Sequence, residues 1–238
     1  MGESITGPVG ELRDIVGHLK RLMREDMEMG LEPPSLSPST LRYLDGGVSG
    51  FASLENLKQF IGDCRRCKLC QGRTKLVFGE GSPEAKLVFV GEGPGRDEDL
   101  AGLPFVGEAG KLLTRIIVAM GLTREEVYIC NVVKCRPPKN RDPEEDEVEA
   151  CLPFLKEQLN LIRPQVVCTL GRVAGQTLLG KEFKITRERG SWYTFMETPL
   201  MPTFHPAYLL RNPSAKRQVW EDIQKIMKRL GLEVKKDV

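Results

Sequence analysis

The stretch from residue 87 to residue 113 constrains the fold of this chain most strongly. It begins with a short apolar run, Leu87 to Val90, that is typical of a strand buried on both faces. Three glycines and a proline follow between Gly91 and Gly95, which indicates a tight turn whose backbone passes close to a neighbour. A second loop runs from Pro104 to Gly107, and a helical pattern begins near Glu108. Open α/β sheets build binding sites where a strand ends in such a loop, so we expect a functional site here.

The composition of the first loop argues against a phosphate or dinucleotide site. Its glycines do not follow the G-x-G-x-x-G spacing, and no P-loop Gly-Lys-Ser/Thr is present. The carboxylates between residues 92 and 99 outnumber the cations by four to one: Glu92, Asp97, Glu98 and Asp99 against Arg96. Phosphate sites need exposed N–H groups and positive charge, so this loop suits a neutral polar ligand with N–H donors, or a developing cation. A purely structural turn is the alternative, but it does not explain the aromatic Phe105 in the second loop.

Strand and helix patterns alternate through the rest of the chain. Apolar runs at residues 127–133, 166–170 and 200–204 have the length of strands, and segments of helical periodicity separate them. This alternation predicts an α/β domain over residues 53–238. Its architecture is expected to be three-layer α/β/α with a central, mostly parallel four-stranded sheet.

Some local features add to this pattern. Residues 76–78 predict a further short strand, and residues 184–195 predict a hairpin. The sequence from Asp142 predicts a helix start with Asp142 as the N-cap and Pro143 in the first helical position. A basic amphipathic helix is expected over residues 214–230.

The N-terminal part has a different character. Residues 1–30 carry apolar side chains at helical spacing and predict one amphipathic helix, whereas residues 31–52 are rich in Pro, Gly and Ser and predict a linker. This helix could pack on the domain, mediate self-association or bind a partner, and packing is the simplest of the three. No apolar run is long enough to cross a membrane and no signal-peptide core follows Met1, so we expect a cytoplasmic protein.

Charge is nearly balanced overall but clustered locally. The net charge is +2, so no global field points to nucleic acid. Basic residues nevertheless gather in two segments, Arg65, Arg66, Lys68, Arg73 and Lys75 in the first and Lys134, Arg136, Lys139 and Arg141 in the second. Such patches can hold a polyanion, although a solvated face explains either cluster equally well when it is taken alone.

Cysteine spacing predicts a metal site. In a reducing compartment, seven cysteines are expected to be thiols or metal ligands rather than disulfides. Cys64 and Cys67 form C-x-x-C, Cys70 repeats the spacing, and Cys135 and Cys151 can supply two further thiolates. By spacing alone, zinc and an iron–sulfur cluster are equally consistent. A thioredoxin-like redox pair is not expected, because no βαβ unit surrounds the C-x-x-C.

Two polar residues stand at predicted strand ends or within strands. His205 closes the fourth predicted strand, and Pro206 excludes helical geometry at His205, so its imidazole is expected to be held at the strand end. It is a candidate acid or oxyanion donor, with a capping role as the alternative. Asn131 lies in the second strand pattern, where a buried amide must be hydrogen-bonded, either structurally or by a ligand.

These features together resemble the family 4 uracil-DNA glycosylases, the iron–sulfur branch of that superfamily. The matching segments are GEGPGRDEDLAGLPFVGEAG (91–110), YICNVVKCRPPKNR (128–141) and TFHPAYLLRN (203–212), with the two cysteine pairs. The similarity covers roughly residues 53–230. It implies an enzyme of base excision repair that hydrolyses the N-glycosidic bond of flipped-out deoxyuridine in single- or double-stranded DNA and leaves an abasic site.

The resemblance also implies a cofactor and partners. It assigns a structural [4Fe–4S] cluster to Cys64, Cys67, Cys135 and Cys151, which would fasten both basic segments near DNA. We expect a monomer whose N-terminal helix is available to a partner. A non-catalytic iron–sulfur protein on the same scaffold, one that binds DNA or senses redox state, is the alternative.

Site roles follow from the same resemblance. Phe105 would stack on uracil, and Asn131 would read its O4 and N3–H, a pattern that cytosine cannot match. As catalytic residues, Glu92 would face the cationic sugar and orient water, and His205 would donate to O2 of the leaving uracil. Three more positions are expected to bind substrate: Gly93, Glu98 and Asn140. The classical enzymes carry Asp where this chain has Gly93, so water activation must come from elsewhere. Tyr208 and Leu209 are candidates for a wedge that enters the duplex.

Overall fold

A computed structural model describes residues 17–18, 21–22 and 48–233 of the chain. The chain divides into two compact units, Met1–Gly50 and Phe51–Val238, and the second is the α/β domain considered below. The predicted N-terminal helix (1–30) and linker (31–52) lie largely outside the described residues. Within the predicted helix, the structure describes residues 17–18 and 21–22, and these are helical. None of the described helices is both long and apolar enough to span a membrane.

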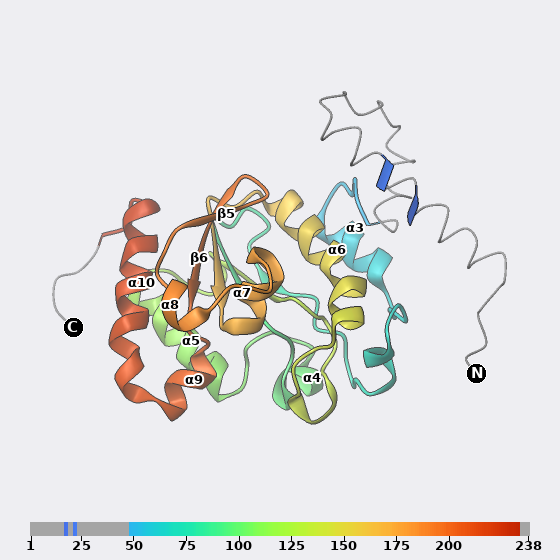
Figure 1. Ribbon diagram of the computed structural model, residues 1–238, viewed down its shortest axis with the longest axis horizontal. Helices are drawn as coiled ribbons and strands as arrows, with labels where there is room; N and C mark the ends of the chain where they lie inside the picture. The colour runs from blue at the N-terminus through green and yellow to red at the C-terminus, as the bar shows by residue number, and fades with distance from the viewer. Residues whose placement is uncertain (1–16, 19–20, 23–47, 234–238) are drawn as a thin grey trace. The chain divides into compact units, whose positions relative to one another are not determined.

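A six-stranded sheet in the order β1-β3-β2-β4-β6-β5 forms the centre of the domain (Figure 1). Its four inner strands are parallel: β2 (Leu87–Gly91), β3 (Tyr128–Asn131), β4 (Val166–Leu170) and β6 (Thr198–Thr203). Two antiparallel edge strands flank them, β1 (Glu80–Gly81) and β5 (Tyr193–Phe195). The mostly parallel sheet is thus confirmed, but it has two more strands than the predicted four. Such short, half-buried edge strands lack the continuous apolar run by which the inner strands were recognised.

Helices cover both faces of the sheet, so the three-layer prediction is also confirmed. One face packs against α5 (Glu108–Ala119), α9 (Pro206–Arg211) and α10 (Lys216–Arg229). The other packs against α6 (Glu145–Ile162) and α7 (Arg172–Leu179), and α3 (Leu54–Ile61) lies on α6. Alternate residues of β2 explain this arrangement, because Leu87 and Phe89 enter the first core and Val88 and Val90 enter the second.

Several local predictions differ from the structure. Residues 76–78 are not a strand, and a short helix, α4 (Arg96–Ala101), follows the glycine-rich loop. The region 184–195 begins with a helical turn, α8 (Ile185–Glu188), and the hairpin is formed instead by β5 and β6. Its two-residue turn, Met196-Glu197, has φ angles of 47° and 64°, which non-glycine residues adopt in tight hairpin turns.

The start of α6 is also displaced from its predicted cap. Glu144, not Asp142, is the N-cap, and its N–H donates to the carboxylate of Glu147 at 2.8 Å. Asp142 forms an ion pair with Arg172 at the start of α7. This long-range contact, which the local capping pattern could not reveal, takes the Asp142 carboxylate away from the helix end.

Candidate active site

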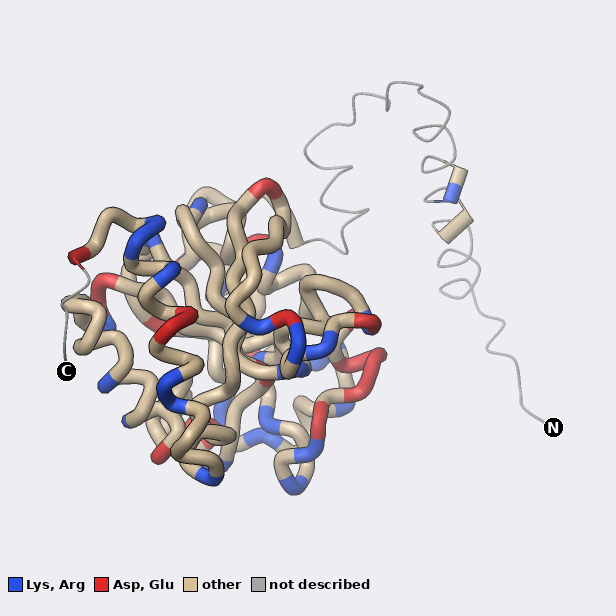
Figure 2. Tube along the Cα trace, turned by 60° about the vertical axis from the view of Figure 1, so that its left-hand side comes forward, with Lys and Arg blue, Asp and Glu red and all other residues tan. Residues whose placement is uncertain are grey.

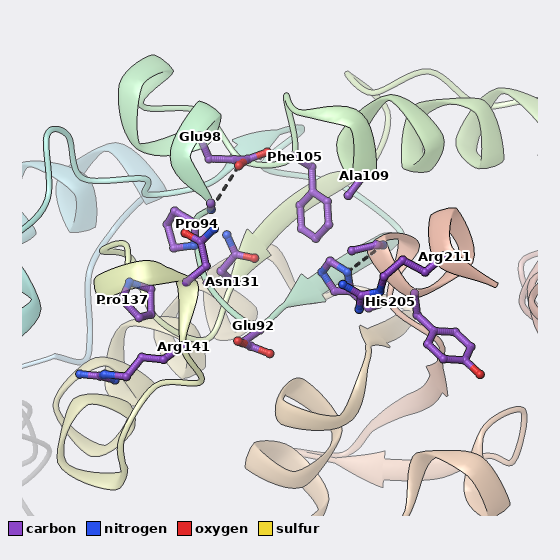
Figure 3. Close-up of a pocket in the computed structure, with 15 residues that line it drawn as sticks. Glu92, Pro94, Glu98, Phe105, Ala109, Asn131, Pro137, Arg141, His205 and Arg211 are labelled. Atoms are coloured by element: carbon purple, nitrogen blue, oxygen red, sulfur yellow. Dashed lines mark hydrogen bonds between the residues drawn. The ribbon is translucent and has the colours of Figure 1, made fainter.

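A pocket of about 410 Å³ opens at the carboxyl ends of β2, β3 and β6 (Figure 3). This is the edge at which doubly wound sheets bind their ligands. All seven predicted catalytic and substrate-binding residues line it: Glu92, Gly93, Glu98, Phe105, Asn131, Asn140 and His205. Segments more than a hundred residues apart in the sequence therefore meet in one cavity.

Phe105 projects its ring into the pocket from a strained loop. Its φ is 53°, a left-handed conformation that is uncommon for a residue with a bulky side chain. Arg124 holds the loop by donating to the carbonyl of Pro104 at 2.9 Å and to that of Phe105 at 3.2 Å. The ring stacks on the imidazole of His205, with 5.5 Å between centroids and 30° between planes. Local strain of this kind is retained where the surrounding structure fixes it, as at ligand sites.

Asn131 presents an amide oxygen that no protein group satisfies. The residue is 1% exposed, and its Oδ1 has no hydrogen-bond partner among the described residues. Most buried polar side-chain atoms have a partner, so an orphaned oxygen at a pocket calls for an N–H from a ligand. In the described residues, Thr169 Oγ1 is the other buried side-chain atom without a partner, and Thr169 does not line the pocket.

The glycines of the loop make room for protein side chains. A Cβ atom on Gly91 would lie 2.4 Å from Asn131 Oδ1 and 2.6 Å from the ring of Phe105. At Gly93 it would lie 2.8 Å from Val133. The close approach expected from the sequence is therefore present, and the neighbours that leave no room for a Cβ atom are the Asn131 amide, the Phe105 ring and Val133.

His205 carries its imidazole at the start of α9. Its Nδ1 accepts a hydrogen bond from the N–H of Ala207 at 3.1 Å, which leaves Nε2 to carry the proton of the neutral ring. Burial lowers the pKa of His205 to about 4; Glu98 opposes this shift and Arg211 adds to it. At neutral pH the ring is therefore uncharged, and this favours a hydrogen-bond donor over a cationic acid.

Glu92 follows β2 and lies between Arg141 and His205 in Figure 3. Burial raises the pKa of its carboxyl to about 7; the nearby carboxylate of Asp142 adds to the shift and Arg172 opposes it. The group therefore changes charge near neutral pH, within the range in which a general base is effective.

Glu98 lines the pocket, and both of its carboxylate oxygens accept hydrogen bonds from backbone N–H groups. Oε1 accepts from the N–H groups of Val106 and Gly107, both at 2.9 Å, and Oε2 accepts from that of Gly95 at 3.1 Å. These contacts join the glycine-rich loop to the loop that presents Phe105. Glu98 thus fixes the position of the Phe105 ring.

The opposite wall contains Asn140 and Arg141. Asn140 Oδ1 accepts from Arg136 Nε at 2.8 Å. Arg141 donates twice to the buried carboxylate of Glu147 on α6, at 2.8 and 2.6 Å. Sequence reasoning gave Arg141 only a general basic role and did not single out Arg211, which also lines the pocket. Both lie inside matched segments, which was the available signal.

Of the two residues predicted to form a wedge, one is exposed and the other is buried. Tyr208 is 38% exposed and lines the pocket, but Leu209 is 1% exposed and belongs to the core. Leu210, at 43%, is the exposed leucine. Because α9 turns by about 100° per residue, consecutive apolar residues point to different sides, and the sequence alone did not show which side faces the core.

The four predicted cysteines come from three segments that converge. Cys64 and Cys67 precede the 3₁₀ turn η1 (Lys68–Gln71), Cys135 follows β3, and Cys151 lies on α6. Burial and neighbouring thiols of this set raise the pKa values of the Cys67, Cys135 and Cys151 thiols. This mutual effect shows that the thiols lie near one another.

Hydrogen-bond donors also point at these sulfurs. Arg73 donates to Cys135 Sγ at 3.1 Å, the N–H of Lys134 to Cys151 Sγ at 3.3 Å, and Arg66 to Cys64 Sγ at 3.5 Å. Such donors suit thiolate ligands, whose charge they stabilise. Within the described residues, no three Cys, His, Asp or Glu side chains form a group that could hold a single metal ion.

Both basic segments contain cations that form ion pairs, and Arg141 of the second segment pairs with Glu144 and Glu147. In the first, Arg65 and Arg73 pair with Asp63, and Lys68 pairs with Glu144 and Asp146. Figure 2 shows Lys and Arg interspersed with Asp and Glu over the domain. Three of the five cations of the first segment therefore pair with carboxylates, which weakens the expectation that this segment binds DNA.

Comparisons with known proteins identify the family of this chain. Residues 78–224 match the model of the uracil DNA glycosylase superfamily. A type-4 uracil-DNA glycosylase of Sulfurisphaera tokodaii is 49% identical over 183 residues, which cover 73% of this chain and 83% of the relative. Those of Saccharolobus solfataricus (44% over 188 residues; 75% and 87%) and Thermotoga maritima (47% over 176 residues; 72% and 92%) are similar to it as well. The chain therefore belongs to the uracil-DNA glycosylase superfamily and, within it, to the type-4 enzymes.

Proposed function

We propose that the pocket hydrolyses the N-glycosidic bond of deoxyuridine in DNA, with the side chains described above in defined roles. The observation that carries this proposal is the buried, unpartnered Oδ1 of Asn131 beside the ring of Phe105. A pyrimidine with an N3–H satisfies that oxygen while it stacks on the ring. Uracil offers this donor together with O4, an acceptor for the amide N–H, whereas cytosine offers neither.

Binding precedes chemistry. A uracil flipped out of the DNA stack enters the pocket and stacks on Phe105, and Asn131 pairs with its N3–H and O4. Because a mismatched base would leave the Asn131 amide unpaired and buried, this contact discriminates strongly. Glu98 contributes indirectly, by holding the loop of Phe105 to the glycine-rich loop.

Bond cleavage requires two electrostatic contributions. Uracil leaves as an anion with charge on O2, and the neutral His205 can donate a hydrogen bond to it from its protonated Nε2. The sugar develops oxocarbenium character, and an ionised Glu92 stabilises it and orients the attacking water. No carboxylate stands at Gly93, so Glu92 carries this task in our proposal.

We further propose that Cys64, Cys67, Cys135 and Cys151 hold a [4Fe–4S] cluster. Four converging thiols, with N–H donors aimed at three of them, fit such a ligand set. A cluster bound there would hold together the three segments that carry these cysteines, and its chemistry would be structural rather than part of bond cleavage. Protein purified without oxygen should be brown and contain about four iron atoms per chain, whereas a colourless protein that contains zinc would contradict the assignment.

The cellular setting completes the proposal. The enzyme acts in base excision repair as a cytoplasmic monomer, on single- or double-stranded DNA, with its N-terminal helix available to a partner. The DNA substrate is supported by the similarity to uracil-DNA glycosylases, and the partner site by the helical pattern of residues 1–30. Light scattering of the full chain tests the monomer.

A single-turnover assay tests the function. Enzyme in excess is mixed with a labelled oligonucleotide that contains one uracil, as a single strand and as a duplex, and abasic product is measured after alkaline cleavage. We expect product only from uracil-containing strands. No product from either substrate would contradict the proposal and leave a non-catalytic DNA-binding protein on the same scaffold.

A further inference from the structure

Lys134 is a buried cation that the mechanism above does not use. Its side chain is 0% exposed, and its Nζ donates to the carbonyl of Asn131 at 2.8 Å and to Gln158 Oε1 at 2.5 Å. None of the carboxylates that the structure describes forms an ion pair with it. Burying a charge without an opposite charge is strongly unfavourable, so a lysine kept here needs a reason.

The partners of Lys134 join the base-reading strand to helix α6. Gln158 lies on α6 and is itself oriented, because its Nε2 donates to the carbonyl of Phe78 at 2.9 Å and to the Tyr128 hydroxyl at 3.1 Å. Its Oε1 is thereby turned toward the lysine. The main-chain N–H of Lys134 donates to Sγ of Cys151, also on α6.

We propose that Lys134 is a positioning residue for uracil recognition. Its ammonium donates a hydrogen bond to the Asn131 carbonyl at the end of β3. This contact fixes the backbone from which the side-chain amide of Asn131 projects. Through Gln158 and Cys151 it makes that orientation depend on the helix that carries one of the four thiols. The inference rests on the proposed function, and it deepens that function by naming what orients the specificity residue.

This arrangement explains why a lysine is suited to the position. The Asn131 carbonyl and Gln158 Oε1 supply two acceptors to the buried ammonium. An apolar side chain at residue 134 would leave both acceptors without their donor. The carbonyl of Asn131 could then move, and the amide with it.

The test compares Lys134→Met with Lys156→Met, the same change at an exposed lysine on α6, the helix that carries Gln158. Free uracil and 3-methyluracil are used as inhibitors of uracil excision, because the methyl group removes the N3–H that Asn131 reads. We expect Lys134→Met to reduce the preference for uracil over 3-methyluracil by about tenfold or more, and Lys156→Met to leave it unchanged.

A double variant separates positioning from general damage. If Lys134 acts through Asn131, the change Lys134→Met should reduce the preference no further in an Asn131→Ala background. An unchanged preference in Lys134→Met, or losses that multiply in the double variant, would overturn the inference. Thermal unfolding and visible absorption show whether each variant keeps its fold and its cluster.

Gln158→Met provides a second route if Lys134→Met does not unfold cooperatively. It removes one acceptor of the ammonium and leaves the contact with Asn131, so a smaller loss of preference in the same direction is expected. A wild-type preference in this variant would count against the inference. A native enzyme that neither binds nor excises uracil would overturn the proposed function itself, whereas an active native enzyme with unaffected variants would overturn the role of Lys134 alone.

Discussion

Two walls of the pocket hold their side chains in different ways. On one wall, Glu92 and His205 follow the ends of β2 and β6, and their surroundings supply few polar contacts. The Glu92 carboxylate forms no hydrogen bond with the residues that the structure describes, and the imidazole of His205 accepts one from its own helix start. Burial favours the neutral form of both groups: it raises the pKa of Glu92 to about 7 and lowers the pKa of His205 to about 4.

The other wall is held by hydrogen bonds. Lys134 donates a hydrogen bond to the Asn131 carbonyl, and Arg136 donates to the side chain of Asn140. Arg141 donates two hydrogen bonds to the buried carboxylate of Glu147. Desolvation sets protonation states on the first wall, and hydrogen bonds set geometry on the second. This is the division expected if the first wall performs the chemistry and the second reads the base.

Changing the amide of Asn131 should have the largest effect. We expect Asn131→Asp to shift the ratio of uracil to cytosine excision by about 10⁴ toward cytosine, because a carboxyl group can pair with the N4 amine and, when protonated, with N3. Single-turnover rates on oligonucleotides that contain one uracil or one cytosine measure this ratio. A variant that keeps the wild-type ratio would show that the second wall does not read the base.

Removing the imidazole of His205 tests the first wall. His205→Ala should lower the single-turnover rate by about 10²–10³, the loss expected when one oxyanion donor is removed. His18, an exposed histidine in the N-terminal unit, provides the matched control, and His18→Ala should leave the rate unchanged. A rate close to that of the native enzyme in His205→Ala would mean that another group stabilises the uracil anion.

The pH profile tests Glu92. Its active form is the carboxylate, and its pKa is raised to about 7, so the rate should rise with pH between about 6 and 8 and then level off. His205, with a pKa lowered to about 4, does not titrate in that window. Glu92→Gln should remove the rise and cost about 10² in rate above pH 8, with a smaller loss at acidic pH. Glu84→Gln, at an exposed site, serves as the control, and a flat native profile would refute the role.

The smallest expected effect concerns the two basic segments. Lys139 is exposed next to Asn140 on the second wall, whereas Arg65 is already paired with Asp63. Lys139→Ala should reduce the slope of log binding constant against log salt by about 1 on non-specific DNA, and Arg65→Ala should reduce it less. Equal reductions would show that ion pairing in the free protein does not predict which cations meet phosphate.

Sequence patterns predicted the inner framework well because the relevant information is local. The run 166–170 is β4 to the residue, since a strand buried on both faces must be continuously apolar. Pro206 predicted extended geometry at His205, and its φ and ψ are −66° and 138°. The edge strand β1 was not recognised, because two half-buried residues carry no apolar pattern.

The sequence by itself determined which chemical groups stand at the ends of the parallel strands, because strand ends and glycine-rich turns are set by neighbouring residues. Tertiary structure decided how those groups behave. Burial by distant segments displaced the pKa values of Glu92 and His205, and Asp63, Glu144 and Asp146 formed ion pairs with three cations of the first basic segment. Packing of α9 turned Leu209 inward. Desolvation, ion pairing and packing all depend on residues far apart in the chain, so no local pattern contains them.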